Sequence, residues 1–435
     1  MSKGVALWKK AKKIIPGANS LLSKRSEMFL PEYWPSYYEK AKGVTIWDLD
    51  GKAYTDMSIM GIGANILGYA NDEIDGAVKA AIDKSVSSSF NCPEEVYLAE
   101  QLLELHPWAE MVRYSRAGGE ADAMAIRIAR AASGKDVVAF CGYHGWHDWY
   151  LASNLADDGN LDGMLLPGLQ PKGVPRGLKN TSIPFNYNKF DELEKIVATH
   201  DVGVIMMEPM RSQEPKDGFL QKVRELATRK NIVLIFDEVS SGFRRNIGGI
   251  HLTLGVEPDL AVLGKAMGNG YAIAAVIGRR SVMEAAQSTF MSSTFWTERI
   301  GPTAALAVLK ILRRDQVYGP MLENDAYLKE QWLALAKRHK LELHAHGLPC
   351  VPHFIFGGTK EGYAIKTLIT QEMLKKGYLA FTGVYMCNLH TRKVIDAYLD
   401  ALDGVFAKIA QGLGDNSLAA MLDGPVCHGG FHRLA

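Results

Sequence analysis

Residues 232–238 read Ile-Val-Leu-Ile-Phe-Asp-Glu, and residues 258–265 read Pro-Asp-Leu-Ala-Val-Leu-Gly-Lys. Each stretch holds a short apolar run followed at once by side chains that can hold or transfer a proton. Similar β-branched runs alternate with helical stretches through the middle of the chain. This alternation is typical of a mostly parallel sheet covered by helices. We therefore predict an α/β fold with a large domain built on such a sheet.

Further elements extend this pattern on both sides. The apolar runs Val137–Phe140 and Val202–Met207 are predicted strands, and Glu120–Ala132 has apolar residues spaced for one face of a helix. Nearer the N-terminus, Asp50-Gly51 stands between two short strand candidates and predicts a hairpin.

The pattern predicts three parts of the chain. Residues 1–50 form an N-terminal segment that opens with a short surface helix, and residues 51–305 form the large domain. From residue 306 a long helix is followed by strands such as His353–Phe356 and helices such as Lys393–Ala410. We therefore expect residues 306–435 to be a small C-terminal α+β domain.

Composition excludes several classes of partner. The 435 residues are 47% hydrophobic and 22% charged, and their formal net charge is +1. Proteins that bind nucleic acids or acidic membranes need a clear basic excess, which is absent here. No apolar run approaches the roughly 20 residues of a membrane span. The five cysteines are scattered without CxxC spacing, which favours reduced thiols and a cytoplasmic location.

Chemically useful residues follow the predicted strands. In open α/β sheets the ligand lies at the carboxyl ends of the strands. There Lys265 supplies an amine that can form an imine with an aldehyde, and Asp237 supplies a carboxylate for a protonated pyridine nitrogen. Tyr143 offers a ring for stacking, and Gly118-Gly119 offer backbone N–H groups to a phosphate at a helix N-terminus. Together these groups predict pyridoxal 5'-phosphate (PLP) as the cofactor.

Each of these signals is weak when it is taken alone. A lysine after an apolar strand is more often a solvated loop residue, and Asp237-Glu238 alone resembles a helix N-cap pair. The combination of several strand-end residues reverses that balance. His144, His147 and Asp148 have no second group of potential ligands, so we predict no metal site.

The motifs resemble those of a known family. Residues 234–244, Leu-Ile-Phe-Asp-Glu-Val-Ser-Ser-Gly-Phe-Arg, together with residues 258–266, resemble the signature of class III (fold type I) PLP aminotransferases. Residues 117–130 and Tyr143-His-Gly145 resemble two other blocks of that family. The motifs occur in the family's order over nearly the full length. Within the family, Ile15–Ser20 is similar to the opening of the glutamate-1-semialdehyde aminomutase branch.

The resemblance implies roles for individual residues. Lys265 would be the imine lysine and proton carrier, and Asp237 the partner of the pyridine nitrogen. Val239 and Tyr143 would pack on opposite faces of the ring. The full cofactor-binding set is Gly118, Gly119, Tyr143, His144, Glu208, Asp237, Val239, Lys265 and Thr294.

The resemblance also implies how the phosphate site is completed. Thr294, with Thr297 as the second choice, would reach the phosphate from a partner subunit. A site of this kind exists only at a subunit boundary, so the resemblance implies a homodimer.

Departures from the family pattern bear on the substrate. Ala117 stands where the family usually has serine, and Leu21-Leu22-Ser23 replaces the Pro-Val-Arg whose arginine holds the aminomutase substrate. The string Ser293–Arg299 resembles enzymes that form 8-amino-3,8-dideoxy-octulosonate. The aromatic-rich segments Tyr33–Tyr38 and Trp146–Trp149 suit a sugar pocket. We expect glutamate as the amino acid donor. The expected carbonyl acceptor is the terminal aldehyde of an eight-carbon keto-sugar acid. The alternative function is that of a glutamate-1-semialdehyde 2,1-aminomutase.

A further departure from the family pattern is that Thr297-Glu298-Arg299 replaces the usual Gly-Asn-Pro. Glu298-Arg299 follow the phosphate threonines, and the sequence allows either an interface salt bridge or a substrate contact for them.

A rival hypothesis is a nicotinamide oxidoreductase. Gly61-Ile-Gly63 suggests a nicotinamide-binding turn, but the third glycine, Gly68, lies two residues too late. A nicotinamide oxidoreductase is therefore disfavoured.

Overall fold

The computed structural model describes residues 2–164, 167–431 and 434. The chain divides into two compact units. One is the continuous stretch 72–316, which we call the large unit. The other, the composite unit, joins residues 1–71 to residues 317–435.

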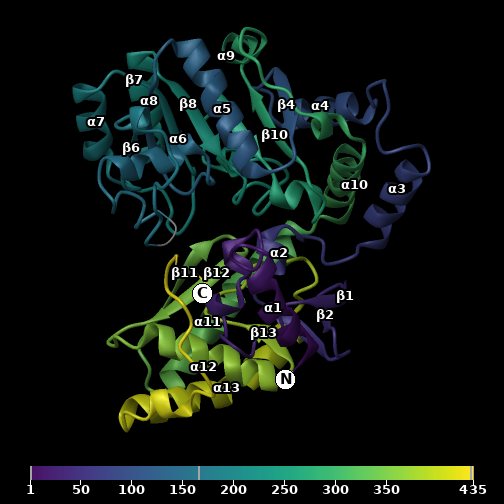
Figure 1. Cartoon of the computed structure of the whole chain (residues 1–435), viewed down its shortest axis with the longest axis vertical. Coiled ribbons are helices and arrows are strands. Elements are labelled where there is room, and N and C mark those ends of the chain that lie inside the picture. The colour runs from purple at the N-terminus through teal and green to yellow at the C-terminus, as the bar shows by residue number, and fades with distance from the viewer. Residues whose placement is uncertain (1, 165–166, 432–433, 435) are drawn as a thin grey trace. The chain divides into compact units, whose positions relative to one another are not determined.

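The large unit is built on a seven-stranded sheet (Figure 1). Its strands, in spatial order, are β4 (Met111–Ser115), β10 (Ala274–Gly278), β9 (Leu260–Leu263), β8 (Val233–Asp237), β7 (Val202–Met207), β5 (Val137–Cys141) and β6 (Ser182–Pro184). Strand β10 is antiparallel to both of its neighbours, and the other strands pair in parallel. The predicted α/β fold with a large, mostly parallel sheet is confirmed.

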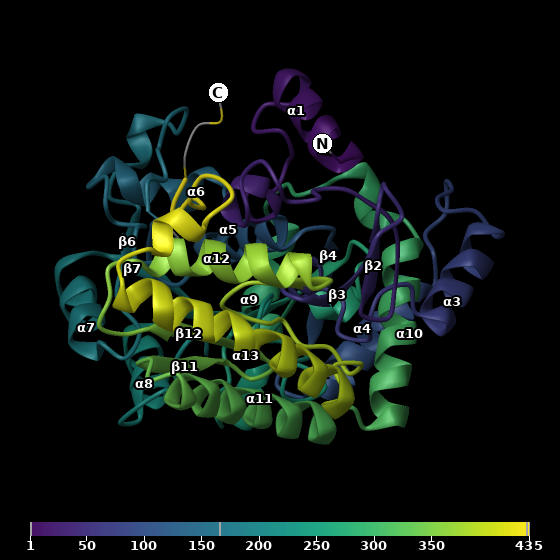
Figure 2. The same ribbon diagram turned by 90° about the horizontal axis from the view of Figure 1, so that it is seen from below.

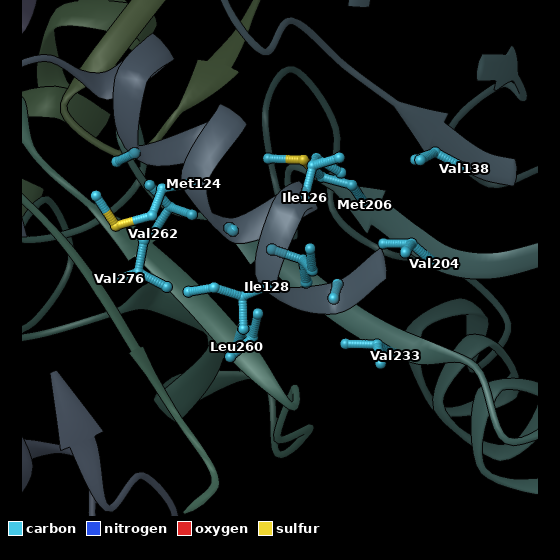
Figure 3. Packing of buried hydrophobic residues seen from close by; sticks show 14 of the residues in the cluster. Met124, Ile126, Ile128, Val138, Val204, Met206, Val233, Leu260, Val262 and Val276 are labelled. Carbon is cyan, nitrogen blue, oxygen red and sulfur yellow. The ribbon is translucent and has the colours of Figure 1, made fainter. Parts of the chain in front are cut away.

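Successive residues of each strand point to opposite faces of this sheet, and both faces are buried. One set, which includes Val138, Val204 and Ile235, packs with helix α5 (Gly118–Ser133). Figure 3 shows this face, where Met124 of α5 lies beside Val262. The intervening residues pack with helices α7 (Phe190–Thr199) and α8 (Phe219–Lys230) on the other face. A sheet buried on both sides explains the continuous apolar runs in the sequence.

Of the remaining helices of the large unit, α6 and α9 contribute residues to the cluster around α5, Trp149 and Met283 among them. Helix α10 packs against both α3 and α4. Their bounds, with those of two short helices, are α3 (Asp72–Ile82), α4 (Glu94–Leu105), α6 (Asp148–Leu151), α9 (Arg280–Met283) and α10 (Ile300–Asp315).

The composite unit is held together by a sheet that joins distant parts of the chain. Its order is β1 (Tyr38–Lys42), β2 (Thr45–Asp48), β3 (Ala53–Met57) and β13 (Tyr378–Ala380). The hairpin predicted at Asp50-Gly51 is present as the antiparallel pair β2–β3. Strand β13 pairs in parallel with β3, with Tyr378 opposite Thr55. The N-terminal strands thus share a sheet with a strand of the C-terminal part. The sequence pattern instead predicts residues 1–50 and 306–435 as separate parts of the chain.

Helices and a second hairpin complete the composite unit. Helices α11, α12 and α13 run side by side (Figure 2). Their aromatic core includes Trp332, Phe354 and Phe406. The bounds are α1 (Lys3–Ile14), α2 (Met60–Gly63), α11 (Tyr318–Arg338), β11 (Leu343–Leu348), β12 (Val351–Phe356), α12 (Gly362–Lys375) and α13 (Arg392–Gly414). Among the described residues, no helix has both the length and the apolar character needed to cross a membrane.

Candidate active site

Four parallel strands of the large unit end at one edge of the sheet. Tyr143 and His144 follow β5, Glu208 follows β7, Asp237 ends β8, and Lys265 follows β9. The backbone N–H of Tyr143 donates to Oε2 of Glu208 at 3.1 Å. His144 contacts Asp237, and the charges of Asp237 and Glu208 both act on Lys265. The structure therefore brings these five predicted residues together; we call them the strand-end cluster.

Lys265 occupies an unusual backbone position within this cluster. Its φ is +42°, in the left-handed region that side chains other than glycine avoid, and such strain is concentrated at functional sites. Its Nζ donates a hydrogen bond to Oγ of Ser240 at 2.6 Å. Burial lowers the pKa of Lys265 below its usual value, although the carboxylates of Asp237 and Glu208 oppose that effect. The amine is thus closer to its neutral, nucleophilic form at neutral pH.

Asp237 is fixed by contacts to both of its carboxylate oxygens. Oδ1 accepts a hydrogen bond from the backbone N–H of Val239 at 2.9 Å, and Oδ2 lies 2.7 Å from Nδ1 of His144. The other ring nitrogen of His144 lies 3.2 Å from the carbonyl oxygen of Cys141. His144 and Asp237 are both buried, so the carboxylate is held in one orientation by a rigid partner.

The start of helix α5 is shaped for close approach by a ligand. A Cβ placed on Gly118 would lie only 2.8 Å from Cγ1 of Val239, whereas one on Gly119 would lie 3.4 Å from its nearest neighbour, Nδ1 of His147. The Glu120 carboxylate accepts the N–H groups of Arg116 and Ala117. The next N–H groups, those of Gly118 and Gly119, have no partner within the helix, as at any helix start. This combination suits a phosphate.

Asp122 and Ser240 belong to this site but did not emerge from the sequence. Asp122 lies one helical turn after Gly118 and is 2% exposed, and its Oδ1 has no hydrogen-bond partner among the described residues. Burial raises its pKa well above the usual value, and the charges of Asp237 and Glu208 add to the effect. The available signal was an acidic residue on the apolar face of a predicted helix. Ser240 carried no comparable signal.

These features fit PLP chemically. A half-buried amine, a rigidly held carboxylate and a glycine cradle at a helix start are the three groups that the cofactor needs. Ring-packing residues are also available, because Tyr143 and Val239 are both half-buried and pack against the core.

Thr294 lies apart from these groups in the sequence and begins an exposed 3-10 turn, Thr294–Thr297. The adjoining charged residues are used within the chain. Glu298 lies 2.8 Å from Nε of Arg116 and accepts the N–H groups that start α10, while Nε of Arg299 donates to Glu94 at 3.1 Å. Glu298 and Arg299 therefore fix this turn to the residue that follows β4 and to α4.

The two tryptophans of the aromatic segment after β5 line a groove of their own. Trp149 is buried in the core, and Trp146 is 70% exposed. Both line a surface groove beside α5, together with Phe290 and Trp296, and the lining includes neither Lys265 nor Asp237. Within the described residues, no group of three or more His, Cys, Asp or Glu side chains is arranged to hold a metal ion.

Comparison with known proteins places this geometry in context. The family model for class-III aminotransferases matches residues 31–395. The chain is 31% identical to the 3-aminobutyryl-CoA aminotransferase of Cloacimonas acidaminovorans (strain Evry), over 94% of this chain and 98% of that protein. It is also 31% identical to the glutamate-1-semialdehyde 2,1-aminomutase of Methanocaldococcus jannaschii, over 93% and 98%.

The fold is shared with solved structures. The structure of an omega-transaminase from Sphaerobacter thermophilus superposes with a TM-score of 0.84 at 24% identity, covering 94% of this chain and 98% of that one.

Proposed function

Because the chain belongs to the class III aminotransferase family and is a PLP-dependent transaminase, we propose that the strand-end cluster is its active site. The observation that carries the proposal is the enclosed amine of Lys265 beside Asp237, whose carboxylate His144 holds at 2.7 Å. The reaction moves an amino group from an amino acid donor to a carbonyl acceptor.

Each residue of the site would have its own role in this reaction. Bound PLP supplies an electron sink for the electrons released when a bond at the substrate Cα breaks. Asp237 holds a proton on the pyridine nitrogen by its negative charge, and His144 keeps that carboxylate oriented. Lys265 Nζ accepts the proton from the substrate carbon and returns it. Gly118 and Gly119 bind the phosphate, while Val239 and Tyr143 hold the ring between them.

We further propose glutamate as the donor and the terminal aldehyde of an eight-carbon keto-sugar acid as the acceptor. The product would be 8-amino-3,8-dideoxy-octulosonate, an intermediate for lipopolysaccharide. The likeness of Ser293–Arg299 to such enzymes supports this acceptor. The absence of an arginine at Leu21-Leu22-Ser23 argues against a substrate held as in the aminomutases. We expect the reaction to take place in the cytoplasm.

The second candidate is glutamate-1-semialdehyde 2,1-aminomutase. The 31% identity to the Methanocaldococcus jannaschii aminomutase over 93% of the chain favours it. In this chain the first arginine after Leu21-Leu22-Ser23 in the sequence is Arg25, and its guanidinium lies 5.6 Å from the ring centre of Phe431. An arginine engaged there is not equivalent to one placed for the substrate carboxylate.

A homodimer forms part of the proposal. Thr294 would reach the partner's phosphate site from its exposed turn. Large aromatic side chains surround that turn: Phe290 is 84% exposed and Phe295 is 69% exposed. Exposed apolar clusters of this kind are typical of surfaces that another chain covers.

A screen of donors and acceptors tests the proposed reaction. Purified enzyme with PLP is incubated with glutamate or alanine and with the keto-sugar acid aldehyde, 3-oxobutyryl-CoA or no acceptor, and amino products are identified by mass spectrometry. A separate reaction contains glutamate-1-semialdehyde alone. We expect amination of the sugar aldehyde with glutamate. Conversion of glutamate-1-semialdehyde without any added donor would replace this assignment with the aminomutase.

A further inference from the structure

Asp122 is a carboxyl group for which the reaction described above has no role. It comes from the second turn of α5, whose first residues, Gly118 and Gly119, form the proposed phosphate cradle. The side chain is almost fully buried, and Oδ1 has no hydrogen-bond partner among the described residues. Buried polar atoms are rarely left unpaired in folded proteins, so an unpaired one inside a ligand site indicates a missing partner.

Charged and titratable groups face Asp122 from every neighbouring strand end. Asp237 acts on it from β8, Glu208 from β7 and Lys265 from β9. Tyr143, after β5, feels the charge of Asp122 more than that of any other group. Asp122 therefore faces the strand-end cluster from the helix that covers the sheet.

Ionisation of Asp122 would be costly in this position. Glu208 is already paired with Arg211 at 3.0 Å, and Asp237 is already held by His144 and the N–H of Val239. A third negative charge would face these two carboxylates in a buried position. It would also repel an anionic phosphorylated cofactor. The carboxyl group avoids this cost when it keeps its proton. Burial favours that state, because it raises the pKa of Asp122 well above the usual value.

We propose that Asp122 is a further positioning residue of the cofactor site, present as a neutral carboxylic acid whose O–H is reserved for the bound cofactor. This inference rests on the proposed site at Lys265. A neutral acid can donate a hydrogen bond, whereas a carboxylate can only accept one. Asp122 thus adds a donor to the cluster without adding charge, and Asp237 remains the carboxylate that meets the pyridine nitrogen.

Infrared difference spectroscopy on the apoprotein at neutral pH tests the protonation state. The wild-type spectrum should contain the C=O stretching band of a protonated carboxyl group that the Asp122→Asn spectrum lacks. Asp403→Asn is the matched control, because Arg338 and His339 lower the pKa of Asp403 and its removal should delete carboxylate bands. An Asp122→Asn difference that shows loss of carboxylate bands overturns the proposal.

A second measurement does not depend on any variant folding. Wild-type apoprotein labelled with ¹³C at the aspartate carboxyl groups should show an isotope-shifted band of a protonated acid at neutral pH. If that band is missing, Asp122 is ionised. Neither spectrum depends on turnover, so failure of the glutamate reaction and failure of this inference are distinguishable.

Cofactor affinity tests the positioning role. PLP binding, followed by absorbance at neutral pH, should weaken no more than about threefold in Asp122→Asn, because the amide N–H replaces the acid O–H. In Asp122→Ala it should weaken at least about tenfold, because the donor is lost. Equal affinity of wild type and Asp122→Ala would show that Asp122 does not contact the cofactor, and a loss in Asp122→Asn as large as that in Asp122→Ala would exclude the donor role.

Discussion

Nδ1 of His144 lies 2.7 Å from Oδ2 of Asp237, and both side chains are buried in the large unit. The contact joins the loop after β5 to the last residue of β8. It fixes the rotation of the carboxylate that we assign to the pyridine nitrogen.

Replacement of His144 should loosen Asp237 without removing it. We expect His144→Asn to weaken PLP binding by roughly 10- to 100-fold, because a hydrogen bond to a buried charged group contributes about 1.5–3 kcal/mol. Equilibrium binding measured by absorbance provides the test. His251→Asn is the control, since it breaks an equally buried contact, 2.8 Å from Glu238, outside the strand-end cluster. Equal losses of affinity in both variants would indicate general destabilisation instead.

The two cradle glycines should respond differently to alanine. In Gly118→Ala the new Cβ would press on Val239 at 2.8 Å, and overpacking of this kind costs about 1–3 kcal/mol. In Gly119→Ala the nearest atom is 3.4 Å away, so the change should be mild. We expect the first variant to lose roughly tenfold or more in PLP affinity and the second only a few-fold. The reverse order would disprove the packing argument.

The lowered pKa of Lys265 predicts a pH-dependent cost to stability. Below its folded-state pKa the amine is protonated in both states, and burial of that charge destabilises the folded apoprotein. Between that pKa and the usual value of 10.5, the unfolded chain binds a proton that the folded chain lacks. Stability then rises with pH by up to about 1.4 kcal/mol per unit.

Apo Lys265→Met should therefore be more stable than wild type at low pH, and its advantage should shrink as pH rises towards 10.5. Thermal unfolding across this pH range measures the difference. Lys265→Arg stays charged throughout and should not show the rise in stability seen in wild type. A constant difference between wild type and Lys265→Met would contradict the shifted pKa.

Complementation between two inactive variants tests whether Thr294 acts across a subunit boundary. In a mixed dimer of Lys265→Ala and Thr294→Val chains, one site receives both defects and the other receives none. We expect activity to reappear when the two are refolded or coexpressed together, up to about half of the wild-type value per mixed dimer. If Thr294 serves its own chain, both sites stay defective and mixing restores nothing. Size-exclusion chromatography with light scattering establishes the dimer itself.

Local sequence predicted the four parallel strands that lead to the candidate site, and the helix that covers them. Apolar runs buried on both sides of a sheet are continuous in sequence, so the strands that carry Glu208, Asp237 and Lys265 could be located directly. Their convergence followed from parallel pairing, which places all carboxyl ends at one edge. The helix over residues 120–132 was equally clear from its spacing, and α5 spans Gly118–Ser133.

Contacts between distant segments could not be predicted in the same way. Nothing in Tyr378–Ala380 marks it as the partner of β3, because a three-residue strand carries almost no pattern. The direction of β10 is likewise decided by its neighbours and not by its own residues. Asp122 was missed because its significance lies in what surrounds it: a carboxyl group one turn into a helix usually faces water.

The pairing of β3 with β13 has a consequence for synthesis of the protein. The large unit is one continuous stretch, so it can fold as soon as residue 316 has left the ribosome. The N-terminal strands must wait for residues 378–380, more than three hundred positions later, before their sheet is complete. Until then the edge of β3 offers unpaired backbone groups to other chains. Nascent chains truncated before residue 378 should therefore be the form of this protein that most needs a chaperone.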